Sequence, residues 1–459
     1  MKIEYARLKE KYVLRGWRDL PFAIYDWKSD RLYEIEQDVF NILQKCDGTT
    51  PLSLVIKTQK EKEIFMEIKE FDFVKIVDHK LPISKKQKYR KASNSLLRNV
   101  CWLITGYCNL NCIHCYIEAP KGKWGELSFE DKIKIIEELE RSNVLSVVIT
   151  GGEPFVSNDI EKLVRILIEN KIHIRGFNTN GIFIPDKILS LFEQHGLNPD
   201  FSISYDGLDF HDAVRGKSGV EKDVILNIEK LLKKGFRVSI NTSLAKSNAN
   251  NVIKLYEKLK EIGIHAWRIN TPSKIGNWKN TQDEVSIETE AETYKQILKR
   301  WLYDGKPFQL SLGSLLRTGK CSGDDPENEE PDLYYPNTRV CEYYYEECSI
   351  LPDGTLVPCQ GYVGILEELR RMPNILEESL STIWDSSRLR EIKEIRIKDL
   401  LEKPVNRICA SCKLLPYCGM GCRIEAYVET GDLYSRAPRN CKLMRKYYEK
   451  DFMPYDRIK

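Results

Sequence analysis

Three cysteines lie close together in the stretch CNLNCIHCY, residues 108–116. Cys108, Cys112 and Cys115 offer three thiol ligands, one fewer than a complete tetrahedral site requires. A short loop can fold three thiolates around one iron–sulfur cluster and leave the fourth iron exposed for chemistry. The alternative is a zinc site with a remote fourth ligand. The spacing therefore indicates a metal centre with an open position.

The composition favours thiolate ligands. The chain has 14 cysteines and only six histidines. Its N-terminus has no apolar stretch of signal-peptide length, and no later run approaches about 18 apolar residues, so we expect a cytoplasmic protein without a membrane partner. In that setting cysteines usually ligate metals or clusters. The 71 basic and 68 acidic side chains leave a net charge of +3, which provides no global field for nucleic acid.

Strand-length apolar runs alternate with amphipathic segments from residue 100 to about 275. Such units predict a parallel sheet wrapped by helices, either an open barrel or a doubly wound sheet. In both architectures the chemistry lies at the C-terminal ends of the strands. The three cysteines follow the first run. The six runs are residues 101–106, 145–150, 173–178, 200–204, 237–241 and 265–270.

The CxxxCxxC spacing and the aromatic residue after it, on the first loop of a six-unit barrel, resemble the radical S-adenosylmethionine (SAM) enzymes. The resemblance implies that Cys108, Cys112 and Cys115 hold a [4Fe-4S] cluster whose open iron binds the amine and carboxylate of SAM. Reductive cleavage of SAM would then yield a 5′-deoxyadenosyl radical. By the same resemblance Tyr116 lies near the adenine, and His114 is a loop residue rather than a ligand.

The second run ends in ITGGEP, which is similar to the GGEP motif of that family. By this resemblance Gly151, Gly152 and Glu153 receive the methionine amine. Glycines permit close approach of backbone, and an acid suits an ammonium group.

Later strand ends carry further polar residues that are similar to the cofactor contacts of the family. Arg215 would bind the methionine carboxylate. Two alternatives remain: the asparagines cap a turn, and the arginine pairs with a helix carboxylate. The residues expected to contact SAM are Asn178, Asn180, Ser204, Asp206 and Arg215.

The region after about residue 310 carries nine of the 14 cysteines and has little periodicity. Its cysteine spacing resembles the seven-cysteine SPASM extension of radical SAM enzymes, which holds two auxiliary iron–sulfur clusters. The alternative is a pair of structural zinc sites. By the resemblance the inner cluster binds Cys341, Cys359 and Cys422, and the outer cluster binds Cys409, Cys412, Cys418 and Cys441.

Seven thiols leave one ligand position of the two auxiliary clusters to be assigned. It is either open to a substrate or filled by Cys321 or Cys348. The stretch CSILPDGTLVPC predicts a hairpin with its turn at Asp353-Gly354. That turn places Cys348 directly across from Cys359, which favours Cys348 as the ligand. The remaining thiols, Cys46 and Cys101, are expected to be small buried apolar groups.

Residues 1–80 alternate short strands with two short helices around the turn CDGTT. This pattern is similar to the PqqD-like precursor-recognition domains of peptide-modifying enzymes. A module with an exposed edge strand can capture an extended leader peptide by adding it to the sheet. The alternative is a dimerisation or packing domain. Residues 81–98 are basic and poor in apolar residues, and are expected to form a solvated tether.

The sequence thus predicts an α/β protein with four regions. They are a winged-helix-like leader-recognition module at 1–80, a basic linker at 81–98, a partial (β/α)6 TIM-like barrel at 99–310 and a SPASM domain at 311–459. The resemblance implies a radical SAM maturase that crosslinks a ribosomally made precursor peptide, with a thioether slightly favoured over a carbon–carbon bond. Electrons would pass through the auxiliary clusters, and a flavodoxin or ferredoxin would serve as reductant.

Two other functions are compatible with parts of this sequence. A formylglycine-forming sulfatase-maturating enzyme shares the barrel and tail, but such enzymes carry an acid just after the position of Cys359. Here that residue is Gln360, which cannot accept a proton at neutral pH. The other function is non-enzymatic: a metal-stabilised scaffold that binds peptides or carries electrons.

Overall fold

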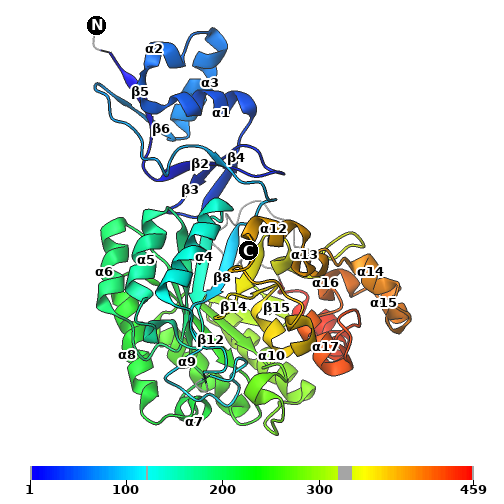
Figure 1. The fold of residues 1–459 in the computed structure, drawn as a ribbon. Helices are drawn as coiled ribbons and strands as arrows, with labels where there is room; N and C mark the ends of the chain where they lie inside the picture. Colours follow the sequence, from blue (N-terminus) through cyan, green and yellow to red (C-terminus); the bar gives the residue numbers. More distant parts are fainter. Residues whose placement is uncertain (1–2, 120–121, 319–332, 457–459) are drawn as a thin grey trace.

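A computed structural model describes residues 3–119, 122–318 and 333–456 (Figure 1). The N-terminal module rises from one end of a large α/β domain, and the cysteine-rich region packs against the side of that domain. No helix in the described part of the chain is long and apolar enough to span a membrane. The candidate ligand Cys321 lies outside the described residues.

The α/β domain is built on one sheet, with strand order β15-β14-β13-β12-β11-β10-β9-β8-β16-β17. Strands β8 to β14 run parallel, as does β16 beside β8. All six predicted strands are confirmed. They are β8 (Asn99–Leu103), β9 (Ser146–Thr150), β10 (His173–Thr179), β11 (Asp200–Ser204), β12 (Arg237–Ser243) and β13 (Ala266–Asn270).

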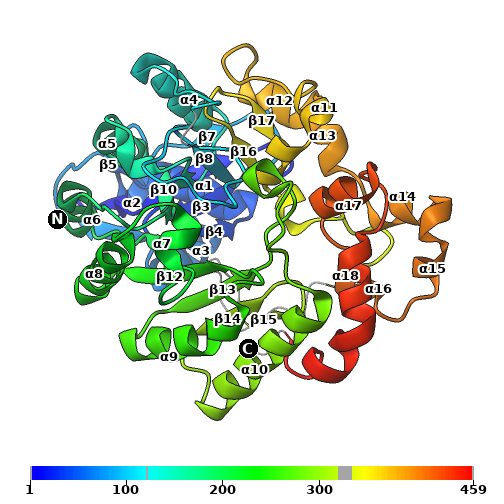
Figure 2. The same cartoon turned by 90° about the horizontal axis from the view of Figure 1, so that it is seen from below.

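Amphipathic helices cover the outer face of this curved sheet (Figure 2). In α4, for example, Ser128 caps the N-terminus by accepting from Asp131 N, and the apolar side chains at 135, 136 and 139 are buried. The helices are α4 (Phe129–Arg141), α5 (Ile160–Glu169), α6 (Asp186–His195), α8 (Val220–Lys233), α9 (Val252–Ile262) and α10 (Ile287–Tyr303). The short helix α7 (His211–Arg215) lies instead at the C-terminal ends of the strands.

The sheet is larger than the six predicted units. At one edge β14 (Gln309–Leu312) extends the parallel set and β15 (Leu316–Arg317) turns back on it. At the other edge the cysteine-rich region contributes the hairpin β16 (Glu347–Ile350) and β17 (Leu356–Val357), and β16 pairs with β8. The sheet therefore extends past residue 310, the boundary predicted between the barrel and the SPASM domain.

The predicted hairpin forms, but its register corrects the argument for Cys348. Ser349 pairs with Val357, so Cys348 is in line with residue 358 and not with Cys359. Because side chains alternate across a strand, a shift of one residue turns Cys348 to the other face of the hairpin. There it is 1% exposed and packs in the core of the α/β domain.

The N-terminal module contains two sheets, with orders β5-β1-β6 and β4-β3-β2-β7. Its helices are α1 (Gln37–Lys45), α2 (Leu52–Val55) and α3 (Gln59–Glu70). A capping box between Thr58 and Glu61 begins α3. The strands are β1 (Tyr5–Leu8), β2 (Tyr12–Gly16), β3 (Ala23–Asp26), β4 (Arg31–Glu34), β5 (Asp47–Pro51), β6 (Val74–Val77) and β7 (Arg90–Lys91).

The basic linker is not a solvated tether, contrary to the prediction. Its strand β7 pairs with β2. The buried Arg15 donates to the carbonyl oxygens of Lys86 at 2.9 Å and Lys88 at 3.3 Å. Gln87 is also buried and donates to the carbonyl oxygens of residues 9 and 12. These backbone partners hold the linker against the module, a result that residue composition does not reveal.

The module packs on the N-terminal ends of the barrel strands. The Tyr25 hydroxyl donates to the carbonyl oxygen of Leu145, just before β9, at 3.1 Å. The His173 ring at the start of β10 lies 3.0 Å from the carbonyl oxygen of Trp27. Trp27 shares the main hydrophobic core with the barrel. The module is therefore at the end of the sheet opposite to the loop that carries Cys108.

The cysteine-rich region consists of short helices, some of which enclose a second hydrophobic core while others pack in the main core. They are α11 (Leu366–Leu369), α12 (Leu380–Ser386), α13 (Arg388–Lys393), α14 (Ile397–Leu401), α15 (Arg407–Ala410), α16 (Leu415–Cys418), α17 (Arg423–Thr430) and α18 (Pro438–Leu443), followed by a π-helical segment (Met444–Phe452). Few of these elements exceed two turns, as expected where bound groups assist the packing.

Candidate active site

The loop with the first three thiols is fixed by backbone contacts to the glycine motif. Gly152 N donates to Thr105 O at 2.8 Å, and Glu153 N donates to Tyr107 O at 2.9 Å. A Cβ at Gly152 would lie 2.1 Å from Tyr107 O, and one at Gly151 would lie 2.5 Å from Thr105 O. The two glycines are therefore required for this close backbone approach.

The three thiols gather in one small apolar cluster. Burial, aided by the Glu153 carboxylate and the neighbouring thiols, raises the pKa of Cys108 to about 12. Burial and the Cys112 thiol also raise the pKa of Cys115. Two polar side chains face the sulfurs: Arg215 Nη1 is 3.7 Å from Cys112 Sγ, and Asn180 Nδ2 is 3.9 Å from Cys108 Sγ. A buried site with donors aimed at sulfur suits thiolates bound to a cationic group.

Glu153 is buried and connects the ends of β9 and β10. Its carboxylate accepts hydrogen bonds from Asn180 N at 2.7 Å, Thr179 Oγ1 at 2.8 Å and Phe155 N at 3.1 Å. Burial raises its pKa to about 7 despite these donors. The acid of the glycine motif thus helps to shape the rim of the site.

The predicted asparagines differ in their surroundings. Asn180 is buried, donates to Asn109 Oδ1 at 2.7 Å and accepts from Ile182 N at 3.0 Å. It therefore connects the thiol loop to the end of β10 and also caps a turn. Asn178 is half-buried within β10, and Ser204 is half-buried at the end of β11. Both lie on the sheet close to the site's rim.

Asp206 and Arg215 form a buried ion pair. The carboxylate accepts from Arg215 Nε at 2.7 Å and from Ser243 N at 2.9 Å. The partner of Arg215 thus lies in the loop after β11, and not on a helix as one alternative held. Through Arg215 this pair reaches the Cys112 sulfur. Burial lowers the pKa of the neighbouring His114 to about 4, which keeps that ring neutral.

Tyr116 connects the thiol loop to the cysteine-rich region. Its hydroxyl donates to Gln360 Oε1 at 2.6 Å, and Gln360 Nε2 lies 2.7 Å from Cys101 Sγ. Gln360 directly follows Cys359. Sequence reasoning placed Tyr116 near the adenine and did not anticipate this bridge, because its partners are more than 240 residues apart along the chain.

The structure brings together the predicted inner thiols. Burial, with contributions from the Cys422 and Cys341 thiols, raises the pKa of Cys359. Cys341 and Cys359 pack against the second core, and Cys422 is the N-cap residue of α17. Cys348 packs instead in the main core of the α/β domain.

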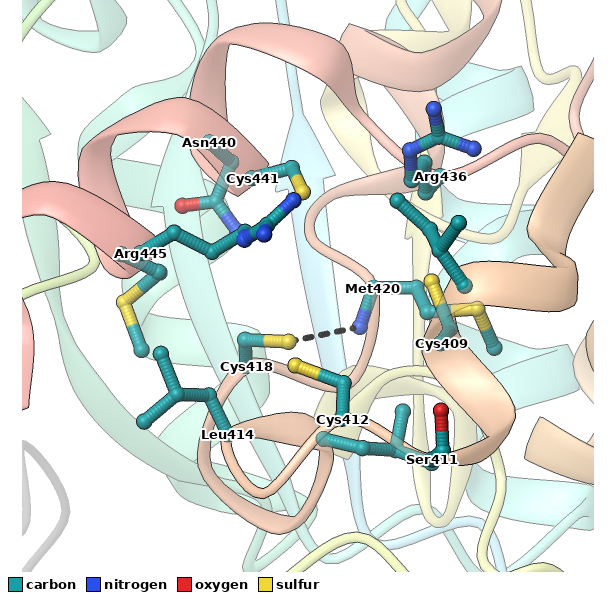
Figure 3. Close-up of a pocket in the computed structure, with 13 residues that line it drawn as sticks. Cys409, Ser411, Cys412, Leu414, Cys418, Met420, Arg436, Asn440, Cys441 and Arg445 are labelled. Carbon is teal, nitrogen blue, oxygen red and sulfur yellow. Dashed lines mark hydrogen bonds between the residues drawn. The ribbon is translucent and has the colours of Figure 1, made fainter.

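The four predicted outer thiols surround a cavity of about 270 Å³ (Figure 3). Cys418 Sγ accepts from Met420 N at 3.4 Å, and Arg436 and Arg445 also line the space. Figure 3 shows sulfur atoms pointing into the cavity from several directions. The lining thiols are Cys409, Cys412, Cys418 and Cys441.

The donor sets fit iron–sulfur clusters. Across residues 3–119, 122–318 and 333–456, no three Cys, His, Asp or Glu side chains converge closely enough to hold a single metal ion. A four-iron cubane binds each thiolate at a separate iron, so its ligands lie farther apart than those of one ion. Soft thiolates in sets of three and four match that chemistry.

Family comparisons agree with this site. Residues 102–259 match the radical SAM superfamily, and residues 341–413 match SPASM, an iron–sulfur cluster-binding domain. The chain belongs to the radical SAM superfamily and carries a SPASM domain. Its radical SAM domain binds a [4Fe-4S] cluster and SAM, and its SPASM domain binds iron–sulfur clusters.

The sequence identity to individual relatives is low. An AdoMet-dependent heme synthase of Methanosarcina barkeri is 27% identical over 74% of this chain and 95% of its own length. The sporulation killing factor maturation protein SkfB of Bacillus subtilis is 28% identical over 63% of this chain and 65% of its own length. The structure of Streptococcus suis SuiB bound to its precursor peptide SuiA is 16% identical, with a TM-score of 0.66, over 95% of this chain and all of SuiB.

Proposed function

We propose that this protein is a cytoplasmic radical SAM maturase that crosslinks a ribosomally synthesised precursor peptide. The observation that carries the proposal is the bridge from Tyr116 to Gln360, which joins the thiol loop of the barrel to the inner thiols of the SPASM domain. A site so connected can abstract a hydrogen atom and then remove an electron nearby. SkfB is named as a maturation protein, and the SuiB structure contains a precursor peptide.

We assign the first cluster to Cys108, Cys112 and Cys115. When bound there, the cluster would supply the electron that cleaves SAM into methionine and the 5′-deoxyadenosyl radical. The chain's own contribution is orientation. The backbone of the GGEP motif binds the methionine amine, and Asp206 holds Arg215 for the methionine carboxylate. Tyr116 packs by the adenine. The other polar contacts assigned to SAM are Glu153, Asn178, Asn180 and Ser204.

We assign the outer cluster to Cys409, Cys412, Cys418 and Cys441, which surround one cavity. The inner cluster takes Cys341, Cys359 and Cys422. Because Cys348 faces the other side of its hairpin, the fourth inner position is open to substrate or belongs to Cys321. An open position favours a thioether product, since a peptide cysteine can bind there.

The N-terminal module is assigned to the leader peptide. Within the described residues, β5 and β6 are the outer strands of its three-stranded sheet, and an edge strand can accept an added strand. Leu54, Met66 and Phe71 are exposed apolar side chains on the adjoining helices and turn. The module is at the far end of the sheet, so the peptide must run outside the barrel to reach the site. A flavodoxin or ferredoxin serves as reductant.

One experiment tests this function. The full chain is reconstituted with iron and sulfide without oxygen, reduced, and incubated with SAM and synthetic peptides encoded by neighbouring reading frames. We expect 5′-deoxyadenosine together with a peptide lighter by two hydrogen atoms. Intact clusters without 5′-deoxyadenosine would contradict catalysis and would favour the scaffold function. An aldehyde product would instead indicate sulfatase maturation, which the amide of Gln360 disfavours.

Heme synthesis is the second candidate, because the M. barkeri heme synthase matches 74% of this chain. The likeness to the SuiB structure covers 95% of this chain and therefore includes most of residues 1–80. A fold shared over this module favours a peptide substrate over a porphyrin. The same assay with an iron porphyrin as substrate distinguishes the two functions.

A further inference from the structure

A lysine lies fully buried against the turn that follows Cys341. Lys393, the last residue of α13, is 0% exposed. Its ammonium donates to the carbonyl oxygen of Tyr343 at 2.8 Å and to that of Glu347. It also lies 4.7 Å from the centroid of the Trp384 ring and 5.4 Å from that of the Tyr344 ring. Two carbonyls and two aromatic faces therefore fix this cation in the interior.

These contacts lead to both turns that carry inner thiols. Tyr344 N donates to Cys341 O at 3.0 Å and closes the turn after that thiol. Tyr362 N donates to Cys359 O at 3.1 Å in the same way. The hydroxyls of Tyr344 and Tyr362 meet at 2.8 Å. Lys393 is thus connected through the buried Tyr344 and Tyr362 to the turns that follow Cys341 and Cys359.

The surroundings of Lys393 suit an ammonium, because two carbonyl oxygens accept from it and two aromatic faces lie over it. Burial lowers the pKa of Lys393 to about 8, while the nearby Cys348 and Cys341 thiols oppose the shift. A neutral side chain at this position would avoid the free-energy cost of burying an ammonium. A buried charge beside a cluster site therefore calls for a functional reason.

We propose that Lys393 raises the reduction potential of the inner auxiliary cluster and so makes it a better acceptor of the substrate electron. This rests on the proposed function, which assigns that cluster to Cys341, Cys359 and Cys422. A cluster gains one negative charge with each electron, so a nearby cation stabilises the reduced form more than the oxidised form. Burial strengthens the interaction because the surroundings screen it weakly.

The carbon radical left by hydrogen abstraction is oxidised by one electron, and the inner cluster is reduced by one. A new bond closes to that carbon, and the bond-forming group of the peptide releases one proton. Lys393 donates no proton and touches no substrate. It acts only through the charge that it holds beside the acceptor.

The test is a redox titration of the full chain followed by electron paramagnetic resonance. Every protein carries Cys108→Ala, Cys112→Ala and Cys115→Ala, so that only auxiliary signals remain. Lys393→Met and Lys393→Gln remove the charge, and Gln keeps a donor for the carbonyls. Lys393→Arg keeps the charge. Lys398→Met is the matched control, because Lys398 is an exposed lysine on the next helix.

At a fixed potential we expect the ratio of reduced to oxidised inner cluster to fall about tenfold in Lys393→Met and Lys393→Gln, which corresponds to a midpoint lower by about 59 mV. Lys393→Arg and Lys398→Met should match the parent. Equal midpoints in all variants would overturn the proposal. So would loss of inner iron from both neutral variants with retention in Lys393→Arg, because the charge would then hold the cluster rather than tune it. Absence of an inner signal in the parent would instead overturn the proposed function.

Discussion

The two ends of the central sheet differ in what they bury. At the C-terminal ends of the strands, the interior holds thiols, an ion pair between Asp206 and Arg215 and the carboxylate of Glu153. At the N-terminal ends it holds aromatic side chains such as Trp17 and Trp27, which seal the module to the barrel. Chemistry and peptide recognition are thus assigned to opposite ends of one scaffold. Substitutions at the two ends should therefore fail in different ways.

The largest expected effect is at the chemical end. Replacing Cys108, Cys112 and Cys115 together by alanine should reduce SAM cleavage below detection, because no first cluster can form. Roughly eight irons should remain in the two auxiliary clusters if each is a cubane. Chromatography of 5′-deoxyadenosine and iron analysis measure the two quantities. Persisting cleavage would contradict the assignment of the first cluster.

Gly152→Ala comes next. Its Cβ would lie 2.1 Å from Tyr107 O and 3.1 Å from Cys108 Cβ, so the thiol loop must shift. A displacement on the order of 1 Å costs about a hundredfold in rate, and we expect that loss in 5′-deoxyadenosine formation. Peptide binding, measured by fluorescence anisotropy, should be unchanged. A wild-type rate would show that the loop does not need this contact.

Arg15→Met probes the opposite end. The substitution leaves three carbonyl oxygens, those of residues 14, 86 and 88, without their donor. We expect the free energy of unfolding, measured by urea denaturation, to fall by about 2 kcal/mol. SAM cleavage at about 20 °C should be unaffected. Lys88→Met removes an exposed lysine nearby and is the control. A parallel loss of cleavage would show that the two ends are coupled.

The smallest effect is expected at the surface of the module. Phe71 is 67% exposed, and Phe71→Ser should weaken binding of the labelled precursor peptide by about fivefold, near 1 kcal/mol. Tyr303→Ser is the matched control, since Tyr303 is an exposed aromatic residue at the end of α10. Equal affinities for both variants would place the leader on another face.

The periodic parts of this fold were predictable from sequence. All six expected barrel strands form, because each carries apolar residues at strand spacing between helices with a clear apolar face; in β11, for example, Phe201 and Ile203 are buried in alternation with polar neighbours. The pairing of β16 with β8 was not predictable. It joins Cys348 to Val100, and no local pattern reports a contact over such a separation. The prediction of a solvated linker was wrong for a similar reason, since contacts between distant segments hold the linker: β7 pairs with β2, and Arg15 and Gln87 donate across the two segments.

The thiol sets show how far spacing alone reaches. The outer four thiols line one cavity, and the family spacing separates them from Cys422, which lies in the same segment but outside that cavity. The assignment of Cys348 depended on the centre of a turn, and an error of one residue reversed its face. The bridge from Tyr116 to Gln360 carries no sequence signal beyond the family spacing.

The added strand β16 also affects how the chain is made. Strand β8 ends at residue 103, and its partner at that edge is complete only at residue 350. At about 5–20 residues per second, synthesis of the intervening segment of roughly 250 residues takes about 12–50 s. Throughout that interval the nascent barrel presents an unpaired parallel edge. The edge of β8 therefore stays unpaired on the ribosome until β16 has been synthesised. We expect chaperones that shield strand edges to bind the nascent chain in that period.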